Sequence, residues 1–201
     1  QNLIVFITTA TLFIGNITAV FQQSVKRMLA YSSIAQAGFM LFGLFALNER
    51  AQEGIILYSA AYSLATIGMF AVLVKMDDYT IEGFNGLAKK QPVMALAATV
   101  FLLSLTGIPL TAGFQSKFFM LMAALQNGHH IWLVIFAVLM AAVSAYYYFR
   151  VIQAMYFREP SAGDLHVTAS QPGFRLMLLI VAALIVALGL YPEFLIGWMY
   201  H

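Results

Sequence analysis

Residues 107–126 read GIPLTAGFQSKFFMLMAALQ, and this stretch decides the fold. It belongs to an apolar segment, residues 92–125, in which Lys117 is the only charged side chain. A straight α-helix over that segment would be about 51 Å long at about 1.5 Å per residue. The hydrocarbon core of a bilayer is only about 30 Å thick. The segment is therefore too long for one straight membrane span.

The middle of the segment carries the residues that break a helix. Gly107 and Pro109 are followed closely by Gly113. Proline removes a backbone donor and clashes with the preceding turn, and glycine permits unwinding. We therefore expect two half-helices, about 92–106 and 114–125, with the break between them. Broken helices at membrane depth occur where they are buried or line a cavity, and they mark ion and substrate sites in transporters.

The composition is that of an integral membrane protein. The 201 residues are 62% hydrophobic and 9% charged, and the mean hydropathy is +0.86. Soluble domains contain about 45–50% apolar and about 25% charged residues. A net charge of +2 without a basic stripe argues against a nucleic-acid partner, and zero cysteines exclude disulfides and thiolate chemistry. No phosphate loop, catalytic triad or metal-ligand cluster is present, so we expect no cofactor or metal in this chain.

Six segments are long and apolar enough to cross a bilayer. Together they predict a single transmembrane domain, residues 1–201, with spans at about 3–22, 29–47, 54–74, 92–125, 131–157 and 173–191. The expected fold class is an all-α, polytopic helix bundle whose fourth span is discontinuous. Because Gln1 leads directly into an apolar segment without an initiator Met, we expect the chain to be a fragment of a longer one.

The loops between these spans alternate between the two sides of the membrane, and their basic residues are unevenly distributed. Arg50 is alone on one side. The other side receives Lys26, Arg27, Lys75, Lys89, Lys90, Arg150, Arg158 and Arg175. The positive-inside rule makes the richly basic side cytoplasmic and places the C-terminus on the outer side.

Lys117 is the one basic residue that this distribution does not place at a membrane surface. A lysine near the bilayer centre costs at least about 2.5–3.5 kcal/mol, so such residues usually face the protein interior and serve a function. The alternative is that Lys117 extends to the outer surface, but Gln126 lies about 13 Å away along the helix axis. In the first turn of its half-helix, the cation would also meet the positive end of the helix dipole. We take Lys117 as the candidate proton-transfer residue.

Other polar residues of the spans could line a proton path. The third span carries Tyr58, Ser59, Tyr62, Ser63 and Thr66 at helical spacing, and the second span carries Gln36. Such residues can hold water, but Ser, Thr and Tyr also commonly join helices in membranes. The second interpretation is favoured except for Tyr62, which lies mid-span.

For two further groups of residues, a structural explanation is favoured over a functional one. His129 and His130 are adjacent in a short outer loop, where a surface position is favoured over a metal site. Tyr146, Tyr147 and Tyr148 precede Arg150, and such a run is typical of the aromatic belt at a membrane interface.

Two long motifs resemble a known family. GNITAVFQQSVKRMLAYSSIAQAGFM (residues 15–40) and LSLTGIPLTAGFQSKFFML (residues 103–121) are similar to the signatures of the proton-pumping, antiporter-like membrane subunits of respiratory complex I, NADH:quinone oxidoreductase. Within the family the N-type subunit is most similar, because the M-type carries a glutamate in place of Lys117. The run YYYFRV (residues 146–151) is also similar to the N-type pattern.

The resemblance implies a fold and a role. The chain would be the C-terminal part of such a subunit: the second inverted repeat plus a terminal helix. Lys117 would end a line of buried charges that passes protons toward the outer side. The enzyme would be a translocase of the respiratory chain that couples quinone reduction to proton pumping, with the redox centres in other subunits. Partners would be other membrane subunits and lipid, in a bacterial inner membrane.

Two departures limit what the resemblance carries over. Gln36 stands where the family often has a histidine, and an amide does not titrate. The family's key glutamate and first two lysines precede the region matched here, so this piece alone should not pump.

Three alternatives stay open: a subunit of a multi-subunit sodium/proton antiporter, a membrane-bound hydrogenase subunit, or an inert structural anchor. The last needs a partner for Lys117, and no acidic residue lies in any expected span.

Overall fold

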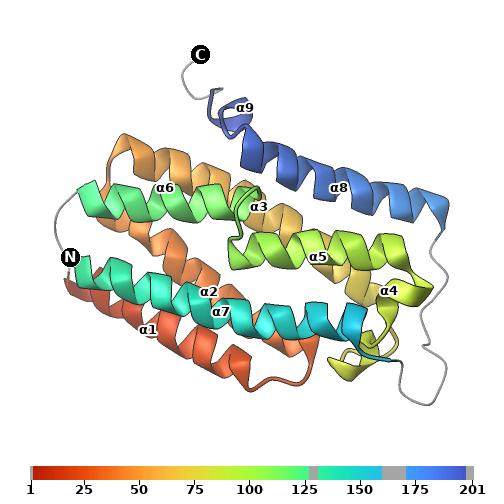
Figure 1. Ribbon diagram of the computed structural model, residues 1–201. Helices are drawn as coiled ribbons and strands as arrows, with labels where there is room; N and C mark the ends of the chain where they lie inside the picture. Colours follow the sequence, from red (N-terminus) through yellow and green to blue (C-terminus); the bar gives the residue numbers. More distant parts are fainter. Residues whose placement is uncertain (1, 127–130, 160–170, 198–201) are drawn as a thin grey trace.

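The computed structural model describes residues 2–126, 131–159 and 171–197, and the regular secondary structure there is helical (Figure 1). The long helices are α1 Asn2–Val20, α2 Val25–Ala46, α3 Glu49–Val74, α5 Pro92–Thr106, α6 Ala112–Gln126, α7 Ile131–Phe157 and α8 Pro172–Leu190. Three short helices complete the order: η1 Glu82–Phe84, α4 Leu87–Lys90 and α9 Glu193–Ile196. The expected all-α bundle with a discontinuous fourth span is confirmed.

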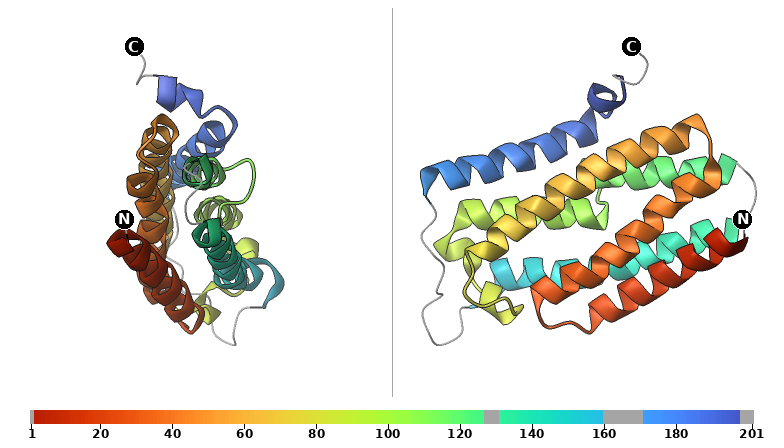
Figure 2. Two further views of the ribbon diagram at one scale, coloured as in Figure 1. Left: turned by 90° about the vertical axis from the view of Figure 1, so that its left-hand side faces the viewer. Right: turned by 180° about the vertical axis from the view of Figure 1, so that it is seen from behind.

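The long helices run side by side along one direction, and α5 and α6 together take the place of one span (Figure 2). By length and hydropathy, α1, α3, α7 and α8 each qualify as membrane spans, and α5 is a shorter apolar helix. Helix α2 has the length of a span, but Lys26, Arg27 and Gln36 make it less apolar.

Two helices begin earlier than expected. Helix α2 starts at Val25 rather than near residue 29, and α3 starts at Glu49 rather than near residue 54. At the start of α3, the Asn48 side chain accepts a hydrogen bond from the Ala51 amide at 2.9 Å, which is an N-cap. Both helices therefore extend through polar sequence that hydropathy alone leaves in the loops.

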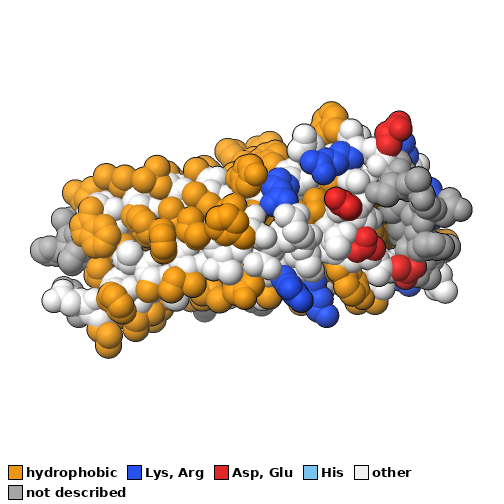
Figure 3. All heavy atoms as spheres, turned by 90° about the horizontal axis from the view of Figure 1, so that it is seen from below, with side chains coloured by type: hydrophobic (Ala, Val, Ile, Leu, Met, Phe, Trp, Pro, Cys, Tyr) orange, Lys and Arg blue, Asp and Glu red, His pale blue; other side chains and the backbone are white. Residues whose placement is uncertain are grey.

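Charged side chains gather at one end of the bundle, around α4 and the link between α3 and η1 (Figure 3). At this end two links pair with each other: the Val25 amide donates to Tyr79 O at 2.8 Å, and the Ile81 amide donates to Gln23 O at 2.9 Å. Arg150 on α7 donates to Val20 O at 3.0 Å and so caps the C-terminus of α1. These contacts fix the charged end of the bundle as one unit.

The break in the fourth span has a defined geometry. Helix α5 ends at Thr106 and is capped by Gly107, whose φ of +88° is the left-handed conformation that glycine adopts without strain. The amides of Gly107 and Ile108 both donate to Leu103 O at 3.0 Å. The chain is then irregular up to Thr111, and α6 begins at Ala112.

Gly113 has a different role from the one expected. It lies in the first turn of α6 rather than in the break, and its amide donates to Ser104 Oγ at 3.2 Å. A Cβ at this position would overlap the backbone carbonyl of Ser104. The glycine is thus required by the close approach of α6 to α5, and not by helix unwinding.

Gly113→Ala should therefore destabilise the protein, because neither backbone can yield without separating the half-helices. Overpacking of this kind costs about 1–3 kcal/mol or more. Thermal unfolding of the purified full-length protein in detergent measures the effect. Gly173→Ala is the matched control, since a Cβ there meets nothing within 4 Å. Equal melting temperatures for the two variants would contradict the close approach described here.

Candidate functional site

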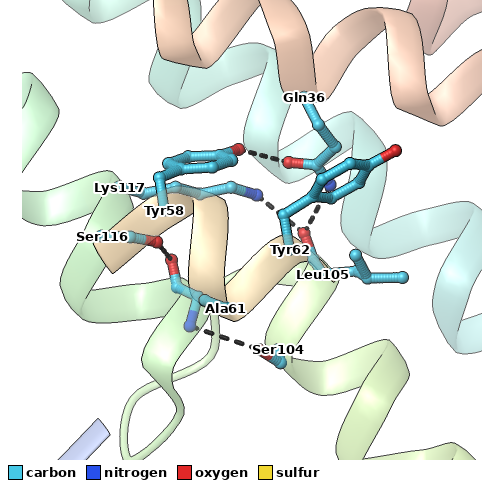
Figure 4. Close-up of a pocket in the computed structure, with 9 residues that line it drawn as sticks. Gln36, Tyr58, Ala61, Tyr62, Ser104, Leu105, Ser116 and Lys117 are labelled. Carbon is cyan, nitrogen blue, oxygen red and sulfur yellow. Dashed lines mark hydrogen bonds between the residues drawn. The ribbon is translucent and has the colours of Figure 1, made fainter. Parts of the chain in front are cut away.

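Lys117 is buried, with 7% of its surface exposed, and its side chain turns toward the end of α5 (Figure 4). Its Nζ donates to Leu105 O at 2.8 Å and to Thr106 O at 3.0 Å. These carbonyls belong to the last turn of α5, where backbone acceptors lack partners within the helix. The lysine does not extend toward the outer end of α6.

The dipole of α5 changes the electrostatics expected at this position. Lys117 lies in α6 near its N-terminus, where a cation is unfavourable, but its ammonium group lies at the C-terminus of α5. A helix C-terminus carries about half a negative charge, which attracts a cation. The expected unfavourable dipole interaction took only α6 into account. The contact with the C-terminus of α5 makes the placement of the charge favourable.

The remaining surroundings of the ammonium group are neutral. The ring of Phe39 lies with its centroid 4.7 Å from Lys117 Nζ, within the range of a cation–π contact. Among the described residues, no carboxylate lies within ion-pair distance of Lys117. The positive charge is thus held by carbonyl dipoles and one aromatic face.

A small cavity lies beside the lysine (Figure 4). Its volume is about 10 Å³, room for roughly one water molecule. It lies where α2, α3, α5 and α6 meet, and it is lined by Gln36, Tyr58, Ala61, Tyr62, Ser104, Leu105, Gly113, Ser116 and Lys117. The break in the fourth span and the lysine therefore face the same polar space.

Gln36 of α2 connects three other helices, α3, α5 and α7, at the cavity. Its Nε2 donates to Leu105 O at 2.9 Å and to the Tyr148 hydroxyl at 3.3 Å, while its Oε1 accepts a hydrogen bond from the Tyr58 hydroxyl. Leu105 O thus accepts from both Gln36 and Lys117. The amide orients these groups, and both of its N–H donors have acceptors.

The structure brings together only part of the predicted path lining. Tyr58 and Tyr62 of α3 line the cavity, whereas Ser63 is exposed and Thr66 lies one turn farther along. Neither Ser63 nor Thr66 lines the cavity, although Thr66 Oγ1 is buried without a hydrogen-bond partner. Ser59 is also exposed. The polar residues of α3 fall on two faces because neighbouring residues differ by about 100° around a helix.

Two tyrosines of α7 were misassigned to a membrane interface. Tyr147 and Tyr148 are fully buried, with ring centroids 4.5 Å apart, and only Tyr146 is exposed, at 58%. The Tyr147 hydroxyl donates to Asn16 Oδ1 at 3.0 Å. The signal for burial was present: the pair continues a helical series of inward positions that includes Ser144 and Val151.

The remaining metal candidate, His129–His130, lies outside the described residues. Within the described ranges, no group of three or more His, Asp or Glu side chains could hold a metal ion.

Residues 1–144 match the family described as "NADH:quinone oxidoreductase/Mrp antiporter, TM". The chain belongs to this family. The resemblance seen in the two sequence motifs is confirmed, and the chain is a multi-pass membrane protein of the antiporter-like type.

Individual members of the family are similar over nearly the whole chain. NADH-quinone oxidoreductase subunit N 2 of Solibacter usitatus (strain Ellin6076) is 41% identical over 198 residues, which are 96% of this chain and 40% of that protein. A chain of respiratory complex I from Thermus thermophilus with bound aureothin is 33% identical, with a TM-score of 0.82, over 96% of this chain and 44% of that one. The present chain thus spans about two fifths of the length of the family members it matches.

The antiporter branch of the family shares the fold. A chain of the Mrp complex from Dietzia sp. DQ12-45-1b matches with a TM-score of 0.84 over 96% of this chain and 45% of that one. At 21% identity this likeness concerns the fold alone.

The hydrogen bond between Tyr147 of α7 and Asn16 of α1 should contribute to stability. Tyr147→Phe should leave Asn16 Oδ1 without its donor, at a cost of about 1 kcal/mol or more. Tyr146→Phe removes the same atom from an exposed ring and should leave stability nearly unchanged. Thermal unfolding of the two full-length variants compares them directly, and equal melting temperatures would show that the hydrogen bond does not contribute.

Proposed function

We propose that this chain is part of a proton-translocating membrane subunit of an NADH:quinone oxidoreductase, and that Lys117 is its proton-transfer residue. The observation that carries the proposal is the Lys117 ammonium group, buried against the last carbonyls of α5 at the break, with no described carboxylate beside it. The 41% identity with NADH-quinone oxidoreductase subunit N 2 of Solibacter usitatus supports the choice of complex.

The geometry suits a group that gains and loses a proton. A buried charge is sensitive to nearby charges, because the low dielectric of the interior strengthens their interaction. Lys117 is held by backbone dipoles and the Phe39 ring, and no carboxylate of the described residues fixes it in the charged form. The adjoining cavity has room for about one water molecule, which would carry a proton to or from Nζ. Tyr58 and Tyr62 present the polar wall on which that water would rest.

The wider assembly follows from this role. Quinone chemistry in other subunits would alter the charge or position of groups near Lys117, and the change would drive its proton on. NAD, flavin and iron–sulfur clusters would belong to those partner subunits, and this chain would hold no cofactor. The host membrane would be a bacterial inner membrane, with the charged end of the bundle in the cytoplasm and the C-terminus outside.

A sodium/proton antiporter subunit is the second candidate, because the family includes the Mrp type and the fold match extends to an Mrp complex. The two functions separate in one assay. Sealed vesicles that hold the complete complex would exchange sodium for protons without any electron donor if the antiporter function were correct. A membrane-bound hydrogenase subunit would instead be identified by the partners that purify with it. An inert anchor is disfavoured, since no acidic residue in the described part of the chain lies beside Lys117 to neutralise it.

Lys117→Ala in the full-length subunit should keep the complex assembled and lower NADH-driven proton pumping several-fold. Removal of the amine deletes the group that carries the proton, while the neighbouring apolar packing stays in place. Acidification inside sealed vesicles, followed with a pH-sensitive dye, measures pumping, and a native gel measures assembly.

Lys89→Ala is the matched control, because Lys89 is 63% exposed and pairs with Glu159 at the charged end. It should pump as the parent does. Unchanged pumping by Lys117→Ala in an assembled complex would refute the proposed role.

A further inference from the structure

A groove runs along one face of α7 near the charged end of the bundle. Its volume is about 370 Å³. Its lining comes from α7 alone and is largely aromatic: Tyr146, Phe149, Arg150, Ile152, Gln153 and Phe157. We propose that this groove is a binding site for one anionic phospholipid, whose headgroup phosphate binds Arg150 and one of whose acyl chains lies along the aromatic rings.

Arg150 lies at the depth where a headgroup phosphate is expected. Its Nη1 donates to Val20 O at 3.0 Å, so the guanidinium group is level with the last turn of α1. Helix α7 continues past that level to Phe157, about 10 Å farther along its axis at about 1.5 Å per residue (Figure 1). Basic side chains lie where the continuous apolar surface of the bundle ends (Figure 3). Arg150 is therefore at the boundary between acyl chains and head groups.

The guanidinium group of Arg150 is held in place and keeps donors for a phosphate. It carries five N–H donors in a planar fork that matches a phosphate group bidentately. Two of these donors go to neutral acceptors, Val20 O at 3.0 Å and Gln23 Oε1 at 3.1 Å. Among the described residues, no carboxylate forms an ion pair with Arg150. Its charge is thus oriented by α1 and the following link without being neutralised.

The deeper part of the groove fits a hydrocarbon chain. Tyr146 lies one turn farther into the bundle than Arg150, and its ring is 58% exposed, while Phe149 is 45% exposed. The Tyr146 ring centroid lies 5.9 Å from Arg150 Cζ, so one ring contacts both the charge and the apolar surface. Because the bilayer interior is itself apolar, a chain in the groove gains packing contacts and no hydrophobic burial. Selectivity among lipids must therefore come from the headgroup.

The charges around the groove favour an anionic headgroup over a zwitterionic one. No acidic side chain lines the groove, so the ammonium group of phosphatidylethanolamine has no partner there. Gln153, one turn beyond Arg150, offers a neutral amide donor. Lys26 and Arg27 follow closely after Gln23, and no described carboxylate forms an ion pair with either of them. Basic pockets between transmembrane helices bind anionic head groups in this way.

The test asks which lipid touches the groove. A photoreactive benzoylphenylalanine replaces Phe149 in the full-length subunit, and the complete complex is placed in vesicles of phosphatidylethanolamine with a minor share of phosphatidylglycerol, which is anionic. Mass spectrometry of the crosslinked peptide identifies the lipid. We expect phosphatidylglycerol to be enriched several-fold over its share of the bilayer. The same probe at Leu139, which is 58% exposed on α7 but outside the groove, should report the bulk composition.

Two variants separate a specific site from general attraction to positive charge. Gln153→Glu leaves the bonds from Arg150 to α1 in place, but its carboxylate pairs with the guanidinium group and repels a phosphate, so the enrichment at position 149 should disappear. Arg158→Gln changes the net charge by the same one unit outside the groove, and it should keep the enrichment.

Equal lipid composition at positions 149 and 139 would overturn the inference. Crosslinks from position 149 to a protein chain would overturn it as well, because they would show that a neighbouring helix covers the groove. If Gln153→Glu fails to assemble, the comparison of the two probe positions still decides. The crosslinks require no proton movement, so their outcome is independent of the pumping result that tests Lys117.

Discussion

The contact between the Lys117 ammonium group and the carbonyls of Leu105 and Thr106 is the interaction on which the rest of the site depends. It satisfies two needs at once. A helix that ends inside a membrane leaves carbonyls without donors, and a lysine buried there leaves a charge without water. The unpaired carbonyls and the buried ammonium group would each cost free energy alone. Each supplies the hydrogen-bond partner that the other lacks. The break and the lysine are therefore best understood as one feature.

Backbone proximity makes that contact possible. Lys117 reaches α5 only because the first turn of α6 lies directly against Ser104, where Gly113 offers no side chain. Gly107 then lets α5 end sharply, so that its last carbonyls point at the lysine. The two glycines serve different ends: one permits a left-handed conformation, and the other permits contact between helices. Replacement of either glycine would move the Lys117 ammonium group away from the C-terminus of α5.

The sequence predicted those parts of the site that depend on local chemistry. The helix break at Gly107 and Pro109 follows from backbone properties, and the isolation of Lys117 follows from counting charges along the spans. What it did not predict depends on how helices rotate against one another. Ser63 and Tyr62 are neighbours in sequence, yet only Tyr62 faces the cavity. Tyr147 and Tyr148 lie near an interfacial arginine, yet they are buried against α1 and α2, because composition does not reveal which side of a helix is covered.

Gln36 gives the site its particular character. A histidine in its place would offer a second group able to bind and release a proton, whereas the amide holds Leu105 O, Tyr58 and Tyr148 in fixed hydrogen bonds. In the proposed function, Lys117 carries the proton, and Gln36 holds the carbonyl oxygen of Leu105 that also accepts from the lysine.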